Sequence, residues 1–117
     1  MSTRAIPLSA HATIEVLAAP LLIAAPFLFG FGQAAGAISI AMGTVLMGLA
    51  ISTVTEARTI PISAHAGFDF AIGMVTVISG LVLGLTTGEA VATAFLVGFG
   101  AAHLALTALT RYSARGV

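Results

Sequence analysis

The sequence predicts an all-α integral membrane protein with four transmembrane helices, arranged as two tandem parallel two-helix repeats within one membrane domain, residues 1–117. Three observations predict it. Hydrophobic residues make up 59 % of the chain and charged residues 7 %, whereas about a quarter of a soluble domain is charged. Residues 16–55 carry no formal charge, a run about twice the roughly 20 apolar residues that one helix needs to cross a bilayer. The sequence also repeats itself.

Glycine-containing turns divide the uncharged runs into helices. Residues 30–33 (Gly-Phe-Gly-Gln) divide the first run and residues 85–89 (Leu-Thr-Thr-Gly-Glu) the second, because glycine admits the backbone angles that end one helix and begin the next. Ser9 and Ser63 each follow a proline by two residues and are expected to cap the first and third helices. The four spans are therefore expected at residues 10–29, 36–55, 64–85 and 90–110.

Small residues spaced four apart, which let transmembrane helices approach closely, predict the packing faces. They are Gly80 with Gly84 in the third span, Thr44 with Gly48 in the second, and Ala94, Gly98 and Ala102 in the fourth. Pro20 and Pro26 lie inside the first span, where each removes a backbone donor and is expected to bend the helix.

Charge placement predicts the orientation and excludes some partners. An even number of spans puts both termini and the central loop on one side, and all the arginines fall there: Arg4, Arg58, Arg111 and Arg115. The positive-inside rule assigns that side to the cytoplasm. A net charge of zero without lysine leaves no basic surface for nucleic acid. Cysteine is absent, which excludes disulfides, thiolate metal sites and a thiol nucleophile.

A comparison of the chain with itself at a spacing of 54 residues shows an internal duplication. Residues 4–12 (RAIPLSAHA) match residues 58–66 (RTIPISAHA) at seven of nine positions. Because each copy contains an even number of spans, the repeats, residues 4–57 and 58–111, should point the same way about an axis along the membrane normal. Equivalent residues then lie at the same depth, His11 with His65 among them.

The end of the first span carries a second pattern. Residues 25–31 read Ala-Pro-Phe-Leu-Phe-Gly-Phe, and residues 79–85 read Ser-Gly-Leu-Val-Leu-Gly-Leu. With the two-helix repeat, this resembles the bacterial Ser-Pro-Trp (SPW) repeat family of small membrane proteins, in which the tripeptide precedes a Gly-aromatic turn. The first copy keeps the proline, the second keeps the serine, and neither has the tryptophan. The resemblance implies a bacterial inner-membrane protein without an established activity, and it carries over no catalytic residue.

Each repeat opens with a histidine followed four residues later by a carboxylate, His11 with Glu15 and His65 with Asp69. At that spacing the two side chains share one helix face. An ionisable group inside the apolar zone is costly, by about 2.5–3.5 kcal/mol at a helix centre, so such groups are functional candidates. The duplication predicts that the two pairs meet.

Three interpretations of this set remain open. In the structural one, each carboxylate orients its histidine or pairs with Arg4 or Arg58 and so fixes the seam between repeats. In the second, the histidines and carboxylates bind a transition metal such as Zn²⁺, Fe or Mn, or His11 and His65 serve as axial ligands of a haem. In the third, the carboxylates change protonation along an ion or proton path.

Three other polar residues are expected to have local roles. His103 lies deeper than the other histidines and is expected to make one interhelical hydrogen bond, to a threonine or a backbone carbonyl. Thr53 is expected to bond the carbonyl one turn back in its own helix. Tyr112 is interpreted as an aromatic residue at the membrane interface, with no further role.

The favoured function is non-enzymatic, a structural or accessory subunit in a homo-oligomer or a larger membrane complex. An enzyme is disfavoured because the sequence contains no Ser-His-Asp set, phosphate loop or nucleotide-binding fingerprint. The alternatives are a haem- or metal-binding membrane protein that uses the His/carboxylate pairs, and a small proton-coupled transporter or channel that uses Glu15.

Overall fold

A computed structural model describes residues 4–55 and 60–113. Its elements, in chain order, are β1 (Ile6–Pro7), α1 (Leu8–Phe29), α2 (Gln33–Val54), α3 (Ile62–Thr87), α4 (Ala90–Leu109) and β2 (Thr110–Arg111). All four helices are long and apolar enough to cross a membrane. The predicted all-α fold with four candidate transmembrane helices is therefore confirmed, with bounds within a few residues of those expected.

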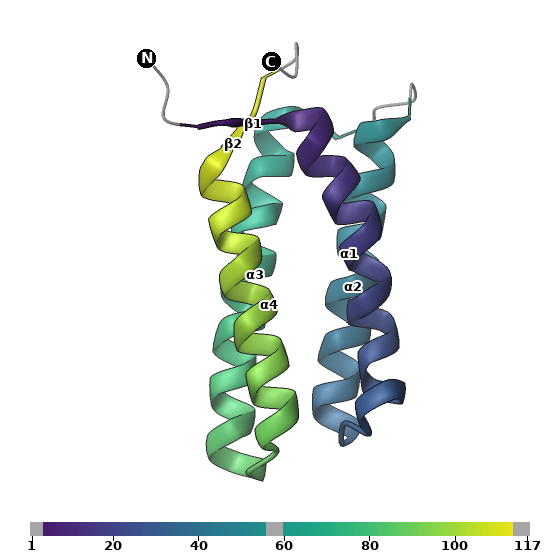
Figure 1. Ribbon diagram of the computed structural model, residues 1–117, viewed down its shortest axis with the longest axis vertical. Helices are drawn as coiled ribbons and strands as arrows, with labels where there is room; N and C mark the ends of the chain where they lie inside the picture. Colours follow the sequence, from purple (N-terminus) through teal and green to yellow (C-terminus); the bar gives the residue numbers. More distant parts are fainter. Residues whose placement is uncertain (1–3, 56–59, 114–117) are drawn as a thin grey trace.

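The helices form two hairpins, α1 with α2 and α3 with α4, which stand side by side with the chain termini at one end (Figure 1). Both hairpin turns lie at the opposite end and contain a glycine in the left-handed conformation, Gly30 with φ 65° and Gly88 with φ 69°. The turns are linked to each other, because the Gly32 N–H donates to a Glu89 carboxylate oxygen at 2.7 Å. The polar turns thus join the two hairpins at this end.

The prediction that Ser9 and Ser63 cap the first and third helices is wrong. Both serines lie inside their helices, and the cap positions belong to Pro7 and Pro61, neither of which makes a side-chain capping bond. A proline in extended conformation can stand immediately before a helix because no intrahelical partner is needed for the N–H that it lacks. Each helix consequently begins one residue before its serine, with Leu8 in α1 and Ile62 in α3.

Helix α1 continues through both of its prolines. Pro26 has no N–H for the carbonyl of Leu22, four residues earlier, and so leaves that acceptor without its usual helical donor. The buried hydroxyl of Ser39 in α2 donates to this oxygen at 2.5 Å. The hydrogen bond lost within α1 is thus replaced by one that joins α1 to α2.

Glycines set the close contact of α3 with α4. A Cβ added to Gly80 would lie 2.9 Å from Val97, and one added to Gly84 would lie 2.8 Å from Thr93, so the predicted pair packs as expected. Gly100 of α4 is tighter still, because its Cβ would lie 2.9 Å from the backbone nitrogen of Val77 and 2.9 Å from the carbonyl oxygen of Gly73. Backbone contact of this kind requires glycine.

The prediction that Gly48 and Gly98 make close helix contacts is wrong. A Cβ on Gly48 or Gly98 would meet no atom of the described residues within 4 Å. In α2 the contact is made instead by Gly43, whose Cβ would lie 2.9 Å from Leu22 and 3.0 Å from the carbonyl oxygen of Ala19. The small-residue spacing occurs on several faces of one helix, and it does not show which face a neighbour covers.

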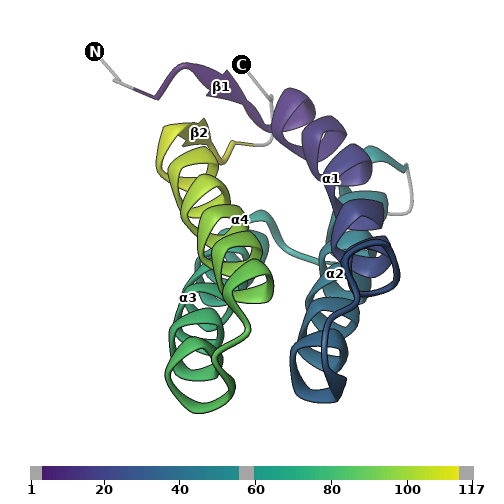
Figure 2. The same cartoon turned by 60° about the horizontal axis from the view of Figure 1, so that its bottom comes forward.

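A two-stranded parallel connection, unexpected from the sequence, closes the end of the bundle that holds the termini. Ile6 pairs with Thr110, and Pro7 pairs with Arg111. Figure 2 shows β1 crossing beside β2 at the tops of α1 and α4. The pairing holds the residues after α4 against the start of α1.

The outer surface suits lipid. Leu17, Phe27 and Leu85 are 70 %, 77 % and 89 % exposed, whereas Leu22, Leu46 and Leu96 fill the interior with no exposed surface. Large apolar side chains that point outward from every hairpin are expected where hydrocarbon rather than water surrounds a helix bundle.

Candidate metal centre

The two predicted His/carboxylate pairs meet in one buried cluster near the end of the bundle that holds the termini. His11 and Glu15 come from α1, and His65 and Asp69 come from α3. Their exposed fractions are 0–2 %. The expectation that the pairs come together is confirmed by the contacts across the two hairpins, 2.9 Å from His11 Nε2 to Asp69 Oδ2 and 3.2 Å from His65 Nε2 to Glu15 Oε1.

The four side chains form a ring in which nitrogen and oxygen alternate. Within each helix, His11 Nε2 lies 3.1 Å from Glu15 Oε1 and His65 Nε2 lies 3.1 Å from Asp69 Oδ2. With the two contacts between helices, all sides of the ring measure 2.9–3.2 Å. A square of that size places its centre about 2.2 Å from each corner, close to the bond lengths of zinc to imidazole nitrogen and carboxylate oxygen, about 2.0–2.2 Å.

The other nitrogen of His65 is held by a threonine. Nδ1 lies 2.8 Å from the Thr53 hydroxyl oxygen, and that hydroxyl donates its own proton to the carbonyl of Leu49 at 3.0 Å. Because the Thr53 hydroxyl donates its proton to the Leu49 carbonyl, its oxygen accepts from His65, and Nδ1 carries the hydrogen. Nε2 is therefore the nitrogen that faces the carboxylates.

His11 is held in the same way by a residue outside the helices. Its Nδ1 lies 2.6 Å from the hydroxyl oxygen of Thr110 in β2, and Thr110 donates to the carbonyl of Leu106 at 2.6 Å. The β1–β2 pairing places Thr110 beside the start of α1. The short strands therefore orient a site residue as well as closing the bundle.

This tautomer has an electrostatic consequence. A neutral ring with hydrogen on Nδ1 carries a lone pair on Nε2. In His11 and His65 that lone pair would face carboxylate oxygens at 2.9–3.2 Å, and electron pairs at this separation repel each other. A proton on Nε2, a proton on the facing carboxyl oxygen, or a metal ion shared by the ring removes this repulsion.

Tyr112 joins the cluster from beyond the end of α4. Its hydroxyl donates to Asp69 Oδ2 at 2.7 Å, and its ring packs edge-on against His11 with centroids 5.4 Å apart. Burial and the hydrogen bond to Asp69 raise the pKa of Tyr112 well above its ordinary value. The interpretation of Tyr112 as an interface aromatic without a further role is therefore wrong, and the phenol orients a carboxylate of the site.

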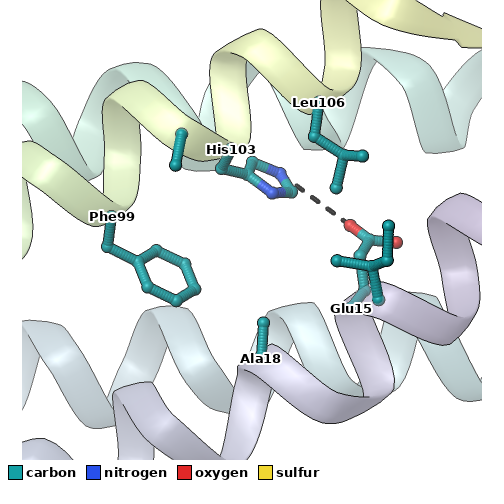
Figure 3. A pocket seen from close by; sticks show the side chains of 7 residues that line it. Glu15, Ala18, Phe99, His103 and Leu106 are labelled. Carbon is teal, nitrogen blue, oxygen red and sulfur yellow. Dashed lines mark ion pairs between the residues drawn. The ribbon is translucent and has the colours of Figure 1, made fainter.

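His103 also faces the cluster, which corrects the expectation of a threonine or backbone-carbonyl partner. Its Nε2 lies 3.5 Å from Asp69 Oδ1 and 3.8 Å from Glu15 Oε2 (Figure 3). The atom is buried and makes no hydrogen bond to the part of the chain described, residues 4–55 and 60–113. The expectation of a greater depth for His103 hid this contact, although His103 lies eight residues before Arg111 and His11 lies seven residues after Arg4.

The structural interpretation expected Arg4 and Arg58 as partners of the carboxylates. Arg58 lies outside the described residues. Arg4 lines a separate cavity of about 460 Å³ together with Phe70 and Tyr112. The carboxylates of Glu15 and Asp69 are instead in contact with the histidines and Tyr112.

The neighbouring threonines are the members that sequence reasoning missed. Thr53 does bond its own helix, as expected, but the same oxygen also accepts from His65.

No protein-family model matches this chain, and neither a curated protein nor a solved structure matches it.

Proposed function

We propose that this protein is an integral membrane protein that binds a transition-metal ion through His11, Glu15, His65 and Asp69. The alternating nitrogen and oxygen ring carries the proposal. One ligand atom from each residue lies within 4.8 Å of the others, and all four residues are buried. A single ion at the centre of the ring would contact all of them.

Charge balance supports a divalent ion. Two carboxylates without any exposed surface bring two negative charges into an apolar interior, where an uncompensated charge costs several kcal/mol. One M²⁺ neutralises both while its bonds to imidazole use the lone pairs that otherwise face the carboxylates. Imidazole with carboxylate suits zinc, iron, manganese and similar first-row ions.

The hydrogen bonds around the ring support the same proposal. Metal-bound histidines usually donate their second N–H to an acceptor that fixes the ring orientation. His65 has Thr53 in that position and His11 has Thr110. Asp69 receives the phenol of Tyr112. Three of the four ring residues thus have a partner that orients them.

The same geometry disfavours haem as the ligand. Axial ligation by His11 and His65 needs a flat macrocycle between the two nitrogens. The carboxylates of Glu15 and Asp69 occupy that space, at 2.9–3.2 Å from both Nε2 atoms. A bare ion fits there without displacing them.

The competing proposal is structural. Protons on His11 and His65 would also balance the carboxylates, and the cluster would then serve as a metal-free ionic seam between the hairpins of a structural or accessory subunit. A proton-coupled transporter would use the same groups with exchangeable protons. Both differ from the metal proposal in one measurable property, the metal content.

The orientation of the protein belongs to the proposal as well. Arg4 shortly precedes β1 and Arg111 lies in β2, and both strands lie at the end of the bundle opposite the hairpin turns (Figure 1). The positive-inside rule assigns this end to the cytoplasm, from which the ion would then enter. Cysteine accessibility in spheroplasts, with single cysteines at residues 2 and 116, tests this orientation.

The test is the metal content of the full chain, extracted in mild detergent without chelators and measured by plasma mass spectrometry. We expect at least one transition-metal ion per chain in the wild type and its loss in Asp69→Asn. Glu89→Gln, which changes a carboxylate in the turn at the other end, is the matched control and should retain the metal. A wild type that is metal-free and also fails to take up Zn²⁺, Mn²⁺ or Co²⁺ would support the ionic seam instead.

A further inference from the structure

Each carboxylate of the ring uses only one of its two oxygens toward the histidines of the ring. Glu15 uses Oε1 and Asp69 uses Oδ2 toward His11 and His65. The second oxygens, Glu15 Oε2 and Asp69 Oδ1, are buried and make no hydrogen bond within residues 4–55 and 60–113. The same holds for Nε2 of His103 and for Nε2 of His11, which already belongs to the ring. A buried charged or strongly polar atom without a hydrogen bond destabilises the fold.

The two second oxygens and His103 Nε2 are three orphaned atoms outside the ring, and His103 Nε2 faces the other two. His103 Nε2 lies 3.5 Å from Asp69 Oδ1 and 3.8 Å from Glu15 Oε2. Each carboxylate has one oxygen facing His11 and His65 and the other facing His103.

We propose a second metal position, bound by His103 Nε2, Glu15 Oε2 and Asp69 Oδ1, so that the site holds two ions bridged by the carboxylates of Glu15 and Asp69. This inference rests on the proposed metal-binding function and extends it. Carboxylates that bind one ion through each oxygen are suited to hold two ions about 3.5–4 Å apart, the spacing of known two-metal sites. One additional ion would satisfy all three orphaned atoms.

The second position is open on one side. Three protein ligands leave at least one coordination site free, and a cavity of about 140 Å³ between α1 and α4 adjoins it (Figure 3). Glu15 and His103 are its polar lining residues, and the other walls are apolar: Ile14, Ala18, Phe99, Ala102 and Leu106. An apolar cavity of about 150 Å³ accommodates benzene, so this one admits a small molecule.

Charge predicts the class of that small ligand. The first divalent ion is neutralised by the carboxylates of Glu15 and Asp69, and the second would leave two positive charges in an apolar interior. An anionic oxygen donor at the open position reduces that charge. Hydroxide fits, because a bound divalent ion lowers the pKa of water to about 7, and small oxyanions have the same donor chemistry.

The test counts ions. Chelator-stripped full-length protein in detergent is saturated with Mn²⁺, desalted and analysed for manganese per chain, with electron paramagnetic resonance on the same samples. The variant is His103→Leu, since leucine occupies the equivalent position in the first repeat, Leu49. We expect two ions per chain with an exchange-coupled spectrum in the wild type, and one ion with an isolated-Mn²⁺ spectrum in the variant.

The other outcomes separate the two proposals. One ion per chain in both proteins would overturn the second position and leave the proposed function intact. Two ions in both, or two uncoupled ions in the wild type, would place the second ion elsewhere and also overturn it. No bound ion in the wild type would overturn the proposed function itself. The coupled spectrum of the wild type decides the question even if the variant does not fold.

Discussion

His65 Nδ1 lies 2.8 Å from the hydroxyl oxygen of Thr53, whose own proton goes to the carbonyl of Leu49. This contact fixes the histidine tautomer, because an oxygen that has already donated its proton can only accept. It joins α2 to α3 across the link between the two hairpins. The nitrogen that faces Glu15 and Asp69 is therefore chosen by a threonine that bonds the other nitrogen of the same ring.

Thr53→Val should weaken metal binding by about 10–100-fold, the usual effect of removing an acceptor behind a histidine ligand. The variant keeps the side-chain shape and removes the oxygen that orients His65. Competition with a chromophoric chelator measures the affinity. Thr44→Val is the matched control, since Thr44 is exposed and its hydroxyl donates to the carbonyl of Ile40 in its own helix. Equal affinities in the two variants would contradict an orienting role.

Tyr112 should stay protonated in the folded protein at a pH where free tyrosine ionises. Burial and the hydrogen bond to Asp69 raise its pKa, whereas in the unfolded chain the pKa is about 10. The stability that the phenol contributes is thus fully present below about pH 10 and is lost as the pH rises through the folded pKa. The chain has one tyrosine and no tryptophan, so absorbance at 295 nm reports Tyr112 alone.

We expect little phenolate in the folded protein between pH 10 and 12, and ordinary ionisation once the protein is denatured. Tyr112 ionising with a midpoint near 10 while circular dichroism shows intact helices would contradict the buried hydrogen bond.

Ser39→Ala should destabilise the α1–α2 hairpin by about 0.6 kcal/mol and at most about 1.7 kcal/mol, the average and the maximum measured for interhelical hydrogen bonds in membranes. The Ser39 hydroxyl is the donor to the Leu22 carbonyl that Pro26 leaves unpaired. In a Pro26→Ala background the backbone N–H returns, and the same Ser39 substitution should cost less. Reversible unfolding in mixed micelles gives the free energy of unfolding of the wild type, the two single variants and the double variant. If the two substitutions change this free energy additively, the Ser39 hydroxyl and Pro26 are not coupled.

Gly100→Ala should destabilise the α3–α4 hairpin by about 1–3 kcal/mol, the usual cost of overpacking. The added methyl would lie 2.9 Å from backbone atoms of both Gly73 and Val77. Gly98→Ala, two residues earlier on α4, is the control. Its Cβ would meet no described atom within 4 Å, and alanine favours the helix by about 1 kcal/mol. In the same unfolding assay we expect Gly100→Ala to lower the free energy of unfolding and Gly98→Ala to raise it. Changes of the same sign in both variants would contradict the packing.

Much of the fold could be predicted because the bilayer imposes it. Uncharged length and glycine turns locate four helices, and the glycines at 30 and 88 do adopt the left-handed conformation expected of a turn. The helix starts were less predictable. Serine is a preferred N-cap residue, but the N-cap of α1 is Pro7 and Ser9 lies inside the helix. Local propensity does not distinguish a cap from a first-turn residue.

The duplication predicted the core of the candidate site, and its asymmetry hid the rest. His11 and His65 occupy equivalent positions, and they meet as the parallel repeat predicts. His103, Thr110 and Tyr112 contribute to the cluster from α4 and the segment after it, where the repeat gives no guide. The positions of Thr110 and Tyr112 depend on the β1–β2 pairing, and strands of two residues leave no recognisable pattern in the sequence.

X-ray absorption at the zinc edge of protein loaded with a single zinc ion per chain tests the proposed centre most directly. We predict a first shell of nitrogen and oxygen at about 2.0–2.2 Å, with outer-shell scattering from at least two imidazole rings. His11→Ala and His65→Ala should each lower the imidazole contribution by one ring. A shell of oxygen alone, or an imidazole contribution that neither substitution changes, would show that these residues do not bind the ion and would contradict the account.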